Sequence, residues 1–431
     1  MKIIPSLKIH ILLTGLCVTL WMCSRNFGDR GGPVFMSGLA LACLAYLLTV
    51  RELFASPKLP RHILLIALGF SVIGQLAFLR KPVGADDDIH RYVWDGHLQR
   101  LGYNPYLVVP SDPAARALHT AETRDLNNPD LTSPYPPGAQ LFFRAVTSIH
   151  ESIFAMRCAF VLCDFAIVLL LLDLLYRTRQ PVHLILVYAL NPLLAVEVAG
   201  SGHIDIVGAL LLVMSAAALV RRWRTAAGLA FALAVAVKFL PIVLVPLYWK
   251  RVRVRDVIFA LFAVGVMSLP FLSHGRIPTG SLNTYVETFR FNGPLFAALN
   301  KIAPARWLAG LAIVAGLVVA MCQRVRSTQW SPPEFAWPLA ATLLFAPVVF
   351  PWYLLWLLPF LTSTSTVLIL LWTVSIIPVY VQWHLRTLNH RWGALPAWAM
   401  VLEYGCLVIA AVLIAWRRHH FKSSNRFRIK R

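Results

Sequence analysis

The chain has 431 residues, of which 58% are hydrophobic and only 14% are charged, with a mean hydropathy of +0.67. A soluble domain carries about 25% charged residues, so this composition excludes an ordinary water-soluble globular protein. The net charge of +21 does not indicate a nucleic-acid partner. Lys and Arg lie in short connections between apolar runs, where the positive-inside rule places them, and not on a basic surface with stacking aromatics.

Apolar runs follow one another along the chain, and most approach the length of about 17–25 residues that a membrane-spanning helix needs. Because open sheets cannot cross lipid, every run is expected to be helical. The predicted fold class is an all-α polytopic membrane protein with about 12–13 transmembrane helices. The runs are 7–24, 34–50, 62–79, 153–176, 182–199, 205–220, 225–249, 256–272, 305–322, 335–350, 352–362, 366–383 and 397–416.

The basic connections predict four parts of the chain and their sides of the membrane. Residues 1–79 hold the first three spans, and residues 80–152 form a large extracytoplasmic loop that should fold as a helical cap. Residues 153–416 hold the remaining spans, with a second outer loop near 273–294. The tail at 417–431 carries seven basic residues and no acidic one, so we expect it in the cytoplasm.

The run 225–249 has basic clusters on both flanks, and both flanks favour the cytoplasm. Lys238 and Pro241 lie in its middle, and proline removes a backbone donor and bends a helix. The pattern therefore predicts a helical hairpin or re-entrant pair that turns near these two residues. A single kinked span with one basic cluster outside is the alternative.

The strongest chemical signal is the run Asp86-Asp87-Asp88 in the first outer loop, which holds nine of the nineteen acidic residues. Three successive carboxylates repel one another, so such a run needs a cation, a proton or a hydroxyl group nearby. It could supply a general base and a metal or hydroxyl ligand. It could equally be an acidic cap at the start of a helix.

Further polar residues of the same loop follow at regular spacing. A helix that begins at Asp88 places Arg91, Tyr92 and Asp95 on one face. Tyr106 and Tyr135 lie in proline-rich turns, where they could stack on a sugar or anchor the cap at the lipid headgroups.

Ionisable residues also lie inside or beside the later spans. His203, Asp205 and Lys238 are costly to place near lipid, by ~2.5–3.5 kcal/mol for a charged group, and such residues are usually functional or paired. Arg276 and Arg290 in the second outer loop could hold a phosphate, although ordinary solvated charge is the simpler interpretation.

These motifs, taken in order, resemble a known family. The segments Asp88-Ile-His-Arg-Tyr-Val-Trp-Asp-Gly96, Gly102-x-Asn-Pro-Tyr106, Tyr135-Pro-Pro137, Gly202-His-x-Asp205 and Lys238-x-x-Pro241 are similar to the GT-C glycosyltransferases. Within that superfamily they look most like bacterial polyprenol-phosphate-mannose-dependent mannosyltransferases and their uncharacterised relatives. The resemblance runs from about residue 60 to residue 290 and weakens after that.

The resemblance implies a hexosyltransferase of the bacterial inner membrane with its active site on the extracytoplasmic side. The donor would be a polyprenyl-phosphate sugar, with mannose the expected hexose, and the acceptor a glycan or lipid hydroxyl. Asp88, and after it Asp87, is expected to be the base. Lys238, Arg91, Arg276 and Arg290 are candidates to bind the departing phosphate, and a divalent cation (Mg²⁺ or Mn²⁺) could bind at Asp86, Asp87 and Asp88.

The alternative from another functional class is a multi-span transporter or flippase for a lipid-linked or envelope precursor. Transporters place charges near the midplane on broken helices, often within inverted repeats. The acids of this chain are concentrated in one outer loop, and the sequence has no two matching halves, so the pattern favours the enzyme. A scaffold for envelope assembly is a third hypothesis.

Overall fold

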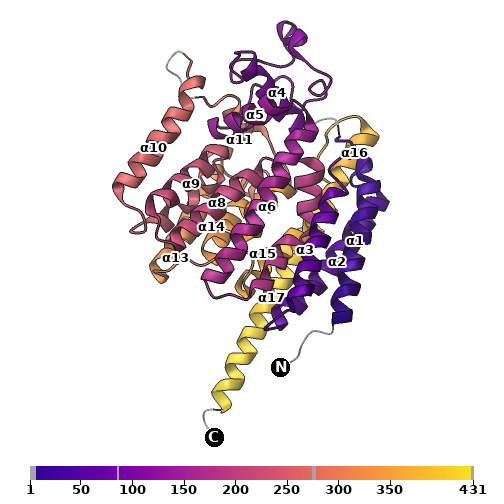
Figure 1. The fold of residues 1–431 in the computed structure, drawn as a ribbon, viewed down its shortest axis with the longest axis vertical. Helices are drawn as coiled ribbons and strands as arrows, with labels where there is room; N and C mark the ends of the chain where they lie inside the picture. The colour runs from indigo at the N-terminus through magenta and orange to yellow at the C-terminus, as the bar shows by residue number, and fades with distance from the viewer. Residues whose placement is uncertain (1–5, 85–86, 274–277, 429–431) are drawn as a thin grey trace.

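The computed structural model describes residues 6–84, 87–273 and 278–428, and this part of the chain is helical, with no named strand. The start of α1 and the end of α17 lie at one end of the body, and the segment between α3 and α6 forms the opposite end (Figure 1). The first helices are α1 (Ser6–Arg25), α2 (Pro33–Ala55), α3 (Arg61–Leu76), α4 (Asp88–Arg100), α5 (Pro137–Ile149), α6 (Ile153–Arg177), α7 (Ile185–Ala189), α8 (Asp205–Val220) and α9 (Arg224–Val237). The later ones are α10 (Val254–Ser268), α11 (Leu282–Thr288), α12 (Pro294–Leu299), α13 (Ala305–Arg326), α14 (Pro333–Leu344), α15 (Val367–Ser375), α16 (Val381–Asn389) and α17 (Ala397–Arg428).

Seven helices of the described part are long and apolar enough to cross a bilayer alone. A bent pair, Val182–Ala189 with Leu194–Ser201 at 57°, adds an eighth. The polytopic all-α class is confirmed, but several of the 12–13 expected spans are shorter or more broken than their apolar runs suggested. The short ones are α3, α8 and α9, and 3₁₀ turns η7 (Pro351–Trp356) and η8 (Leu358–Phe360) replace a regular helix. Irregular backbone at this depth is tolerated where protein or a cavity surrounds it.

The segment 225–249 is a hairpin, as the basic flanks predict. Helix α9 ends before Lys238, which has an extended backbone (φ −158°, ψ 140°), and the 3₁₀ helix η5 (Leu240–Tyr248) follows. The Ser215 hydroxyl near the end of α8 donates to the Ala227 carbonyl (2.7 Å) and lies 2.6 Å from the Tyr248 hydroxyl. The start of α9 and the end of η5 therefore lie at the same end of α8, and the chain reverses at Lys238.

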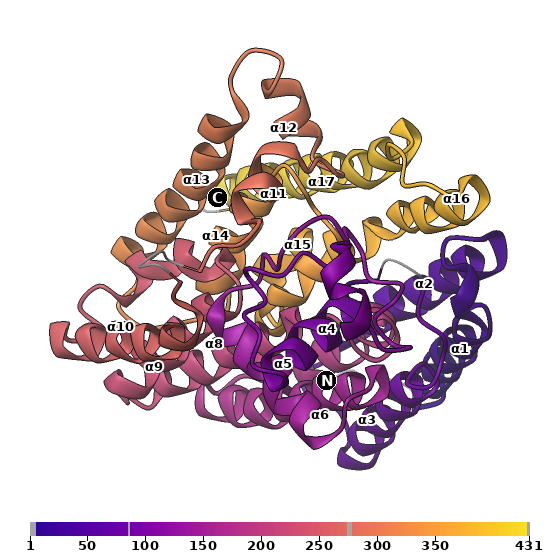
Figure 2. The same cartoon turned by 90° about the horizontal axis from the view of Figure 1, so that it is seen from above.

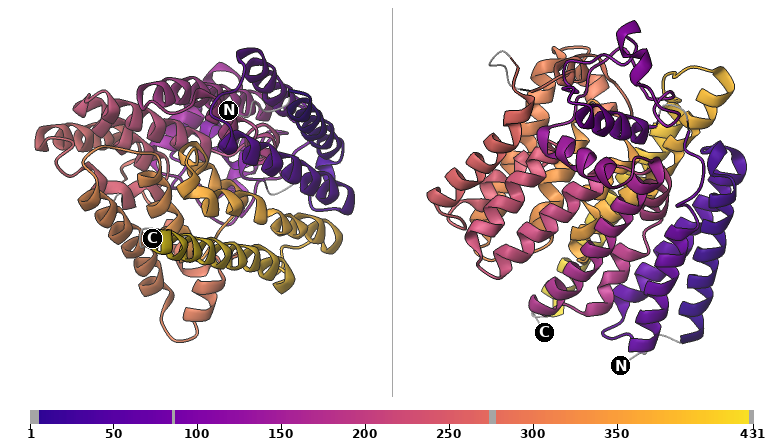
Figure 3. Two further views of the ribbon diagram at one scale, coloured as in Figure 1. Left: turned by 90° about the horizontal axis from the view of Figure 1, so that it is seen from below. Right: turned by 45° about the horizontal axis from the view of Figure 1, so that its top comes forward.

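The large loop folds as a helical cap, also as predicted. Helices α4 and α5 pack on each other, and the cap has a small core of its own, made of Trp94, Leu98, Ala115 and Leu126. Helix α5 packs on α9, and α4 packs on α6, so the cap is attached to the membrane body. Seen from above, α4 and α5 lie toward the middle of the body (Figure 2), and the tilted view in Figure 3 shows them at the end away from the start of α1.

The second outer loop is attached to the C-terminal third of the chain. Phe291 forms an isolated parallel bridge with Val348, and its N–H donates to the Pro347 carbonyl (3.0 Å). The Asn292 amide donates to the buried Glu403 carboxylate of α17 (2.9 Å). These contacts place α11 beside the break between α14 and η7, on the same end of the body as the cap (Figure 1).

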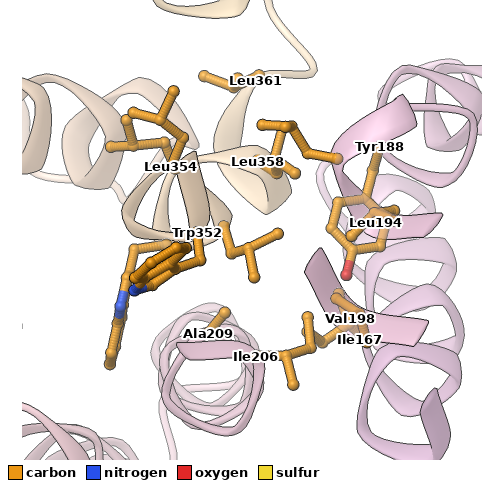
Figure 4. Packing of buried hydrophobic residues seen from close by; sticks show 14 of the residues in the cluster. Ile167, Tyr188, Leu194, Val198, Ile206, Ala209, Trp352, Leu354, Leu358 and Leu361 are labelled. Carbon is orange, nitrogen blue, oxygen red and sulfur yellow. The ribbon is translucent and has the colours of Figure 1, made fainter. Parts of the chain in front are cut away.

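The hydrophobic core joins the middle of the chain to the segment 351–361. Figure 4 shows Leu354 and Leu358 on one side, facing Leu194 and Val198 on the other. Helix α8 comes very close to this segment, because a Cβ built on Gly208 would lie 1.8 Å from the Trp356 ring. Only glycine lets that ring lie against α8 without displacement.

We therefore expect Gly208→Ala to destabilise the fold by about 1–3 kcal/mol, the usual cost of overpacking a dense core. The matched control is Gly310→Ala on α13, where a Cβ meets nothing within 4 Å. Thermal unfolding of the detergent-solubilised protein measures both variants. Equal melting temperatures for Gly208→Ala and the wild type would contradict this account of the core.

Candidate active site

A cavity of about 700 Å³ lies between the cap and the membrane body, at the end where the cap sits. Its walls come from both outer loops, from the reversals at His203 and Lys238, and from the C-terminal third of the chain. Ten aromatic rings line it together with a few charged groups. The charged and imidazole groups are Asp87, Asp88, Arg91, Asp130, His203, Lys238 and Arg290.

Asp88 lines this cavity, as do the buried Asp87 and the exposed Asp130. It begins α4 and is half-buried, and the Asn127 side-chain amide donates to its Oδ1. Within the described residues no cation forms an ion pair with it. Its oxygens are therefore not occupied by a cation among the described residues.

Asp87, the second candidate for the base, is engaged elsewhere. The Arg30 guanidinium donates to both of its oxygens (2.6 and 2.5 Å), and the Gly84 N–H donates to Oδ2 (2.9 Å). Arg30 also donates to the Ser201 hydroxyl (2.7 Å), and both members of the ion pair are buried. This contradicts a role for Asp87 as a free base, because its proton-accepting oxygens are already bound to a cation.

The three aspartates predicted to bind a divalent cation differ in what the structure shows of them. Asp86 lies outside the described residues, Asp87 is paired with Arg30, and Asp88 lines the cavity. Among the residues that the structure describes, no group of three His, Cys, Asp or Glu side chains could hold a metal ion. The cation therefore stays a prediction.

Arg91 lines the cavity, but its donors hold the cap together. It donates to the carbonyls of Leu131 (3.1 Å), Asn127 (2.8 Å) and Asn128 (2.8 Å). Three backbone carbonyls on one guanidinium fix the loop that carries Asn127, and so fix the amide that binds Asp88. The expectation that Arg91 binds a phosphate is therefore not supported by its contacts.

Three other predicted binding residues lie behind the wall and do not line the cavity. Asp95 is fully buried and accepts hydrogen bonds from Ser133 and from Gln140 (2.8 Å). The Tyr106 hydroxyl donates to the Tyr135 carbonyl (2.5 Å), and the Tyr92 ring is buried against Tyr135. These three residues hold the proline-rich loop in shape. Tyr135, which belongs to that loop and was also a predicted binding residue, does line the cavity.

Lys238 reaches the cavity from the reversal between α9 and η5. Its ammonium group donates to Asp205 Oδ1 (2.8 Å) and lies 4.0 Å from the centre of the Tyr353 ring. Asp205 is buried behind it and also accepts from the Trp356 indole (2.6 Å). The Lys238 side chain keeps 22% of its surface exposed, so a cation is available at the cavity wall.

His203 lines the cavity beside Lys238, at the reversal between the bent pair and α8. Its Nδ1 lies 2.9 Å from Oε2 of Glu197, and its ring stacks on Trp352 with centroids 3.9 Å apart. The backbone can reverse there because Gly202 adopts a positive φ of 77°.

Of the two arginines predicted in the second outer loop, Arg276 lies outside the described residues. Arg290 lines the cavity, and its guanidinium donates to the carbonyls at the end of α11, including that of Glu287 (2.7 Å). It is exposed, and it can exchange these carbonyls for another acceptor.

The sequence analysis did not identify the aromatic wall from the C-terminal third, where the resemblance weakens. Tyr353 shares a hydrogen bond of 2.6 Å with Tyr285 of the outer loop, and Trp383 packs edge-on against several of its neighbours. A signal existed in Phe350-Pro-Trp-Tyr353, an aromatic cluster at a proline break between two apolar runs. The ten aromatic rings around the whole cavity are Tyr135, Phe239, Tyr285, Phe289, Phe291, Phe350, Trp352, Tyr353, Trp383 and Trp392.

The helices and the aromatic-lined cavity under the cap define a multi-pass membrane protein with a site large enough for a small or extended ligand. The model of the alpha-(1->6)-mannopyranosyltransferase N-terminal domain matches residues 12–252, more than half of the chain. The chain therefore belongs to this GT-C-type mannosyltransferase family, and it is a glycosyltransferase that uses mannose. Family membership favours the transferase over the transporter. No curated protein and no solved structure matches the chain.

Asp95 gives a prediction on pH. Burial raises its pKa from 3.8 to about 6, against the opposing effects of the Arg91 charge and of hydrogen bonds from Ser133 and Gln140. Because the folded chain holds this proton more tightly than the unfolded chain, the stabilisation is full below pH 3.8 and is lost as the pH rises through about 6. The difference corresponds to about 3 kcal/mol.

We expect Asp95→Asn to remove this part of the pH dependence, since an amide cannot ionise and still accepts from Ser133 and Gln140. Melting temperatures between pH 4 and pH 8 measure the effect. Asp125→Asn, an exposed acid of the same loop, should follow the wild type. Parallel curves for the wild type and Asp95→Asn would show that Asp95 stays ionised in the fold.

Proposed function

We propose that this protein transfers a mannosyl residue from a polyprenyl-phosphate donor to a hydroxyl of a glycan or lipid acceptor, on the extracytoplasmic face of a bacterial inner membrane. Asp88 is the general base. The observation that carries the proposal is the position of Asp88, a carboxylate without a cation among the described residues, on the same cavity as the Lys238 ammonium group.

The two charges suit the two ends of the reaction. The acceptor hydroxyl attacks the anomeric carbon and gives its proton to Asp88, while the bond from that carbon to the phosphate oxygen breaks. The bonding electrons leave with the phosphate, which gains a negative charge. Lys238 is the first candidate to stabilise that charge, and Arg290 the second, because neither is held in a buried network of carbonyls.

The walls of the cavity support a lipid-linked donor. Ten aromatic rings surround a small number of polar groups, and aromatic rings offer apolar surface to an isoprenoid chain and flat faces to a sugar. Helices of the same body expose apolar side chains, such as Phe262 on α10 and Trp307 on α13. A substrate that resides in the membrane can reach such a site from lipid.

The test of the base is Asp88→Asn, assayed with purified protein in proteoliposomes that contain polyprenyl-phosphate mannose and a membrane extract as acceptor. We expect the rate of transfer to fall about 10²–10⁴-fold, the usual contribution of a general base, with the melting temperature unchanged. Asp125→Asn is the matched control and should keep the wild-type rate.

Asp87→Asn separates the two neighbouring acids. The substitution removes the Asp87 charge and leaves the Arg30 guanidinium buried without its partner. Breaking a buried pair in this way costs about 3–5 kcal/mol of folding free energy, so we expect a large loss of stability. A folded, fully stable Asp87→Asn that is inactive, together with an active Asp88→Asn, would transfer the role of base to Asp87.

The side of the membrane is tested by labelling single cysteines in a variant without the seven native ones. Arg124→Cys in the cap should react with a membrane-impermeant maleimide added to intact spheroplasts. Thr328→Cys, in the connection after α13 at the other end of the body, should react only after lysis. The reverse pattern would contradict an extracytoplasmic active site.

A further inference from the structure

We propose that His203 donates its Nε2 proton to the oxygen of the departing phosphate, and that Glu197 and Trp352 are the positioning residues that hold its ring for this task. The inference rests on the proposed function and adds to it the group that assists the leaving phosphate. Its basis is the way in which three elements fix one imidazole at the cavity wall.

The imidazole is fixed on its Nδ1 side and on one face. Nδ1 lies 2.9 Å from Oε2 of Glu197 and 3.3 Å from the Glu197 carbonyl. The ring lies parallel to Trp352, with 9° between the planes, and Trp352 stacks in turn on Phe350 at 4.3 Å. His203 is 2% exposed and nevertheless lines the cavity, which leaves Nε2 as the ring nitrogen available to a ligand.

Glu197 is itself held so that it cannot turn away. It lies on the π-helical turn η4 (Leu194–Ser201), is 1% exposed, and accepts a hydrogen bond from the Tyr380 hydroxyl on its other oxygen. A carboxylate beside one imidazole nitrogen favours the proton on that nitrogen and raises the basicity of the ring, and the other nitrogen becomes a donor when the ring is the imidazolium. The Glu197 carboxylate acts on the ring through its charge at 2.9 Å, while the Glu197 backbone carbonyl is the hydrogen-bond partner of Nδ1.

The charges around His203 come from every element packed against it. Glu197 from η4, Asp88 from α4 and Asp205 from α8 are acidic and favour a protonated ring. Lys238 from α9 is paired with Asp205, and Arg30 is paired with Asp87 while its charge also acts on Glu197. Trp352, from η7, contributes no charge.

The step balances as follows. The acceptor proton goes to Asp88, the new bond forms between the acceptor oxygen and the anomeric carbon, and the old bond to the phosphate oxygen breaks with its electron pair on that oxygen. Protonated His203 then gives the Nε2 proton, or a strong hydrogen bond, to the phosphate. Asp88 then releases its proton to water, and a proton taken from water restores the imidazolium before the next turnover.

The experiment measures kcat and KM for transfer from polyprenyl-phosphate mannose, from pH 5.5 to pH 9, in proteoliposomes. We expect His203→Gln to lower kcat at least about tenfold, with a smaller change in KM for the donor. Glu197→Gln should shift the alkaline limb of the kcat profile to lower pH, because an uncharged neighbour no longer stabilises the imidazolium. His150→Gln, an exposed outer-face histidine of the cap away from the cavity, is the matched control and should leave the profile unchanged.

Either of two outcomes would overturn the inference. The first is a wild-type kcat in His203→Gln. The second is a loss of activity in Glu197→Gln that is equal at every pH, as expected from a structural defect. If His203→Gln does not fold, the pH profile of Glu197→Gln decides by itself, because its side chain is isosteric. Wild-type protein without transfer would refute the proposed function, whereas transfer that persists in His203→Gln and fails in Asp88→Asn would refute this inference alone.

Discussion

The buried ion pair between Arg30 and Asp87 is the contact on which the candidate site depends. Arg30 lies between α1 and α2, and it joins the first residues of the cap to η4 through Asp87 and Ser201. With Asp87 fixed in this way, α4 can begin only with Asp88 at the cavity. One of two adjacent acids is thereby held in a buried ion pair, and the other is the one we propose as the base.

Broken helices turn this membrane body into a site. Regular spans satisfy their own backbone and present side chains to lipid, whereas a reversal exposes polar groups that need protein or water around them. The reversals at His203 and Lys238 and the break at η7 meet under the cap, and each brings a side chain to the cavity wall, His203, Lys238 and Trp352 respectively. The segments that are too short or too broken to cross the membrane as one helix are thus the ones that carry the residues of the proposed reaction.

Several residues that were predicted to bind substrate instead support the wall of the cavity. The predicted binding residues Tyr92, Asp95 and Tyr106 lie one layer behind the wall and hold the proline-rich loop in place. Arg91 does the same with three backbone carbonyls. The spacing of these residues was compatible with a binding face. However, a helix presents only one side to a cavity, and its other side chains must pack against the protein.

The sequence by itself determined the helical membrane fold, the cap and the hairpin at Lys238, and it singled out the acidic run at Asp88 as a prediction. Composition, basic flanks and proline act locally, so they can be recognised in a single chain. Tertiary structure alone decided which acid is free, since Arg30 and Asp87 are far apart in sequence. It also decided that Glu197 lies behind His203 and that Trp352 and the other C-terminal aromatic rings line the cavity, because long-range packing has no period or motif.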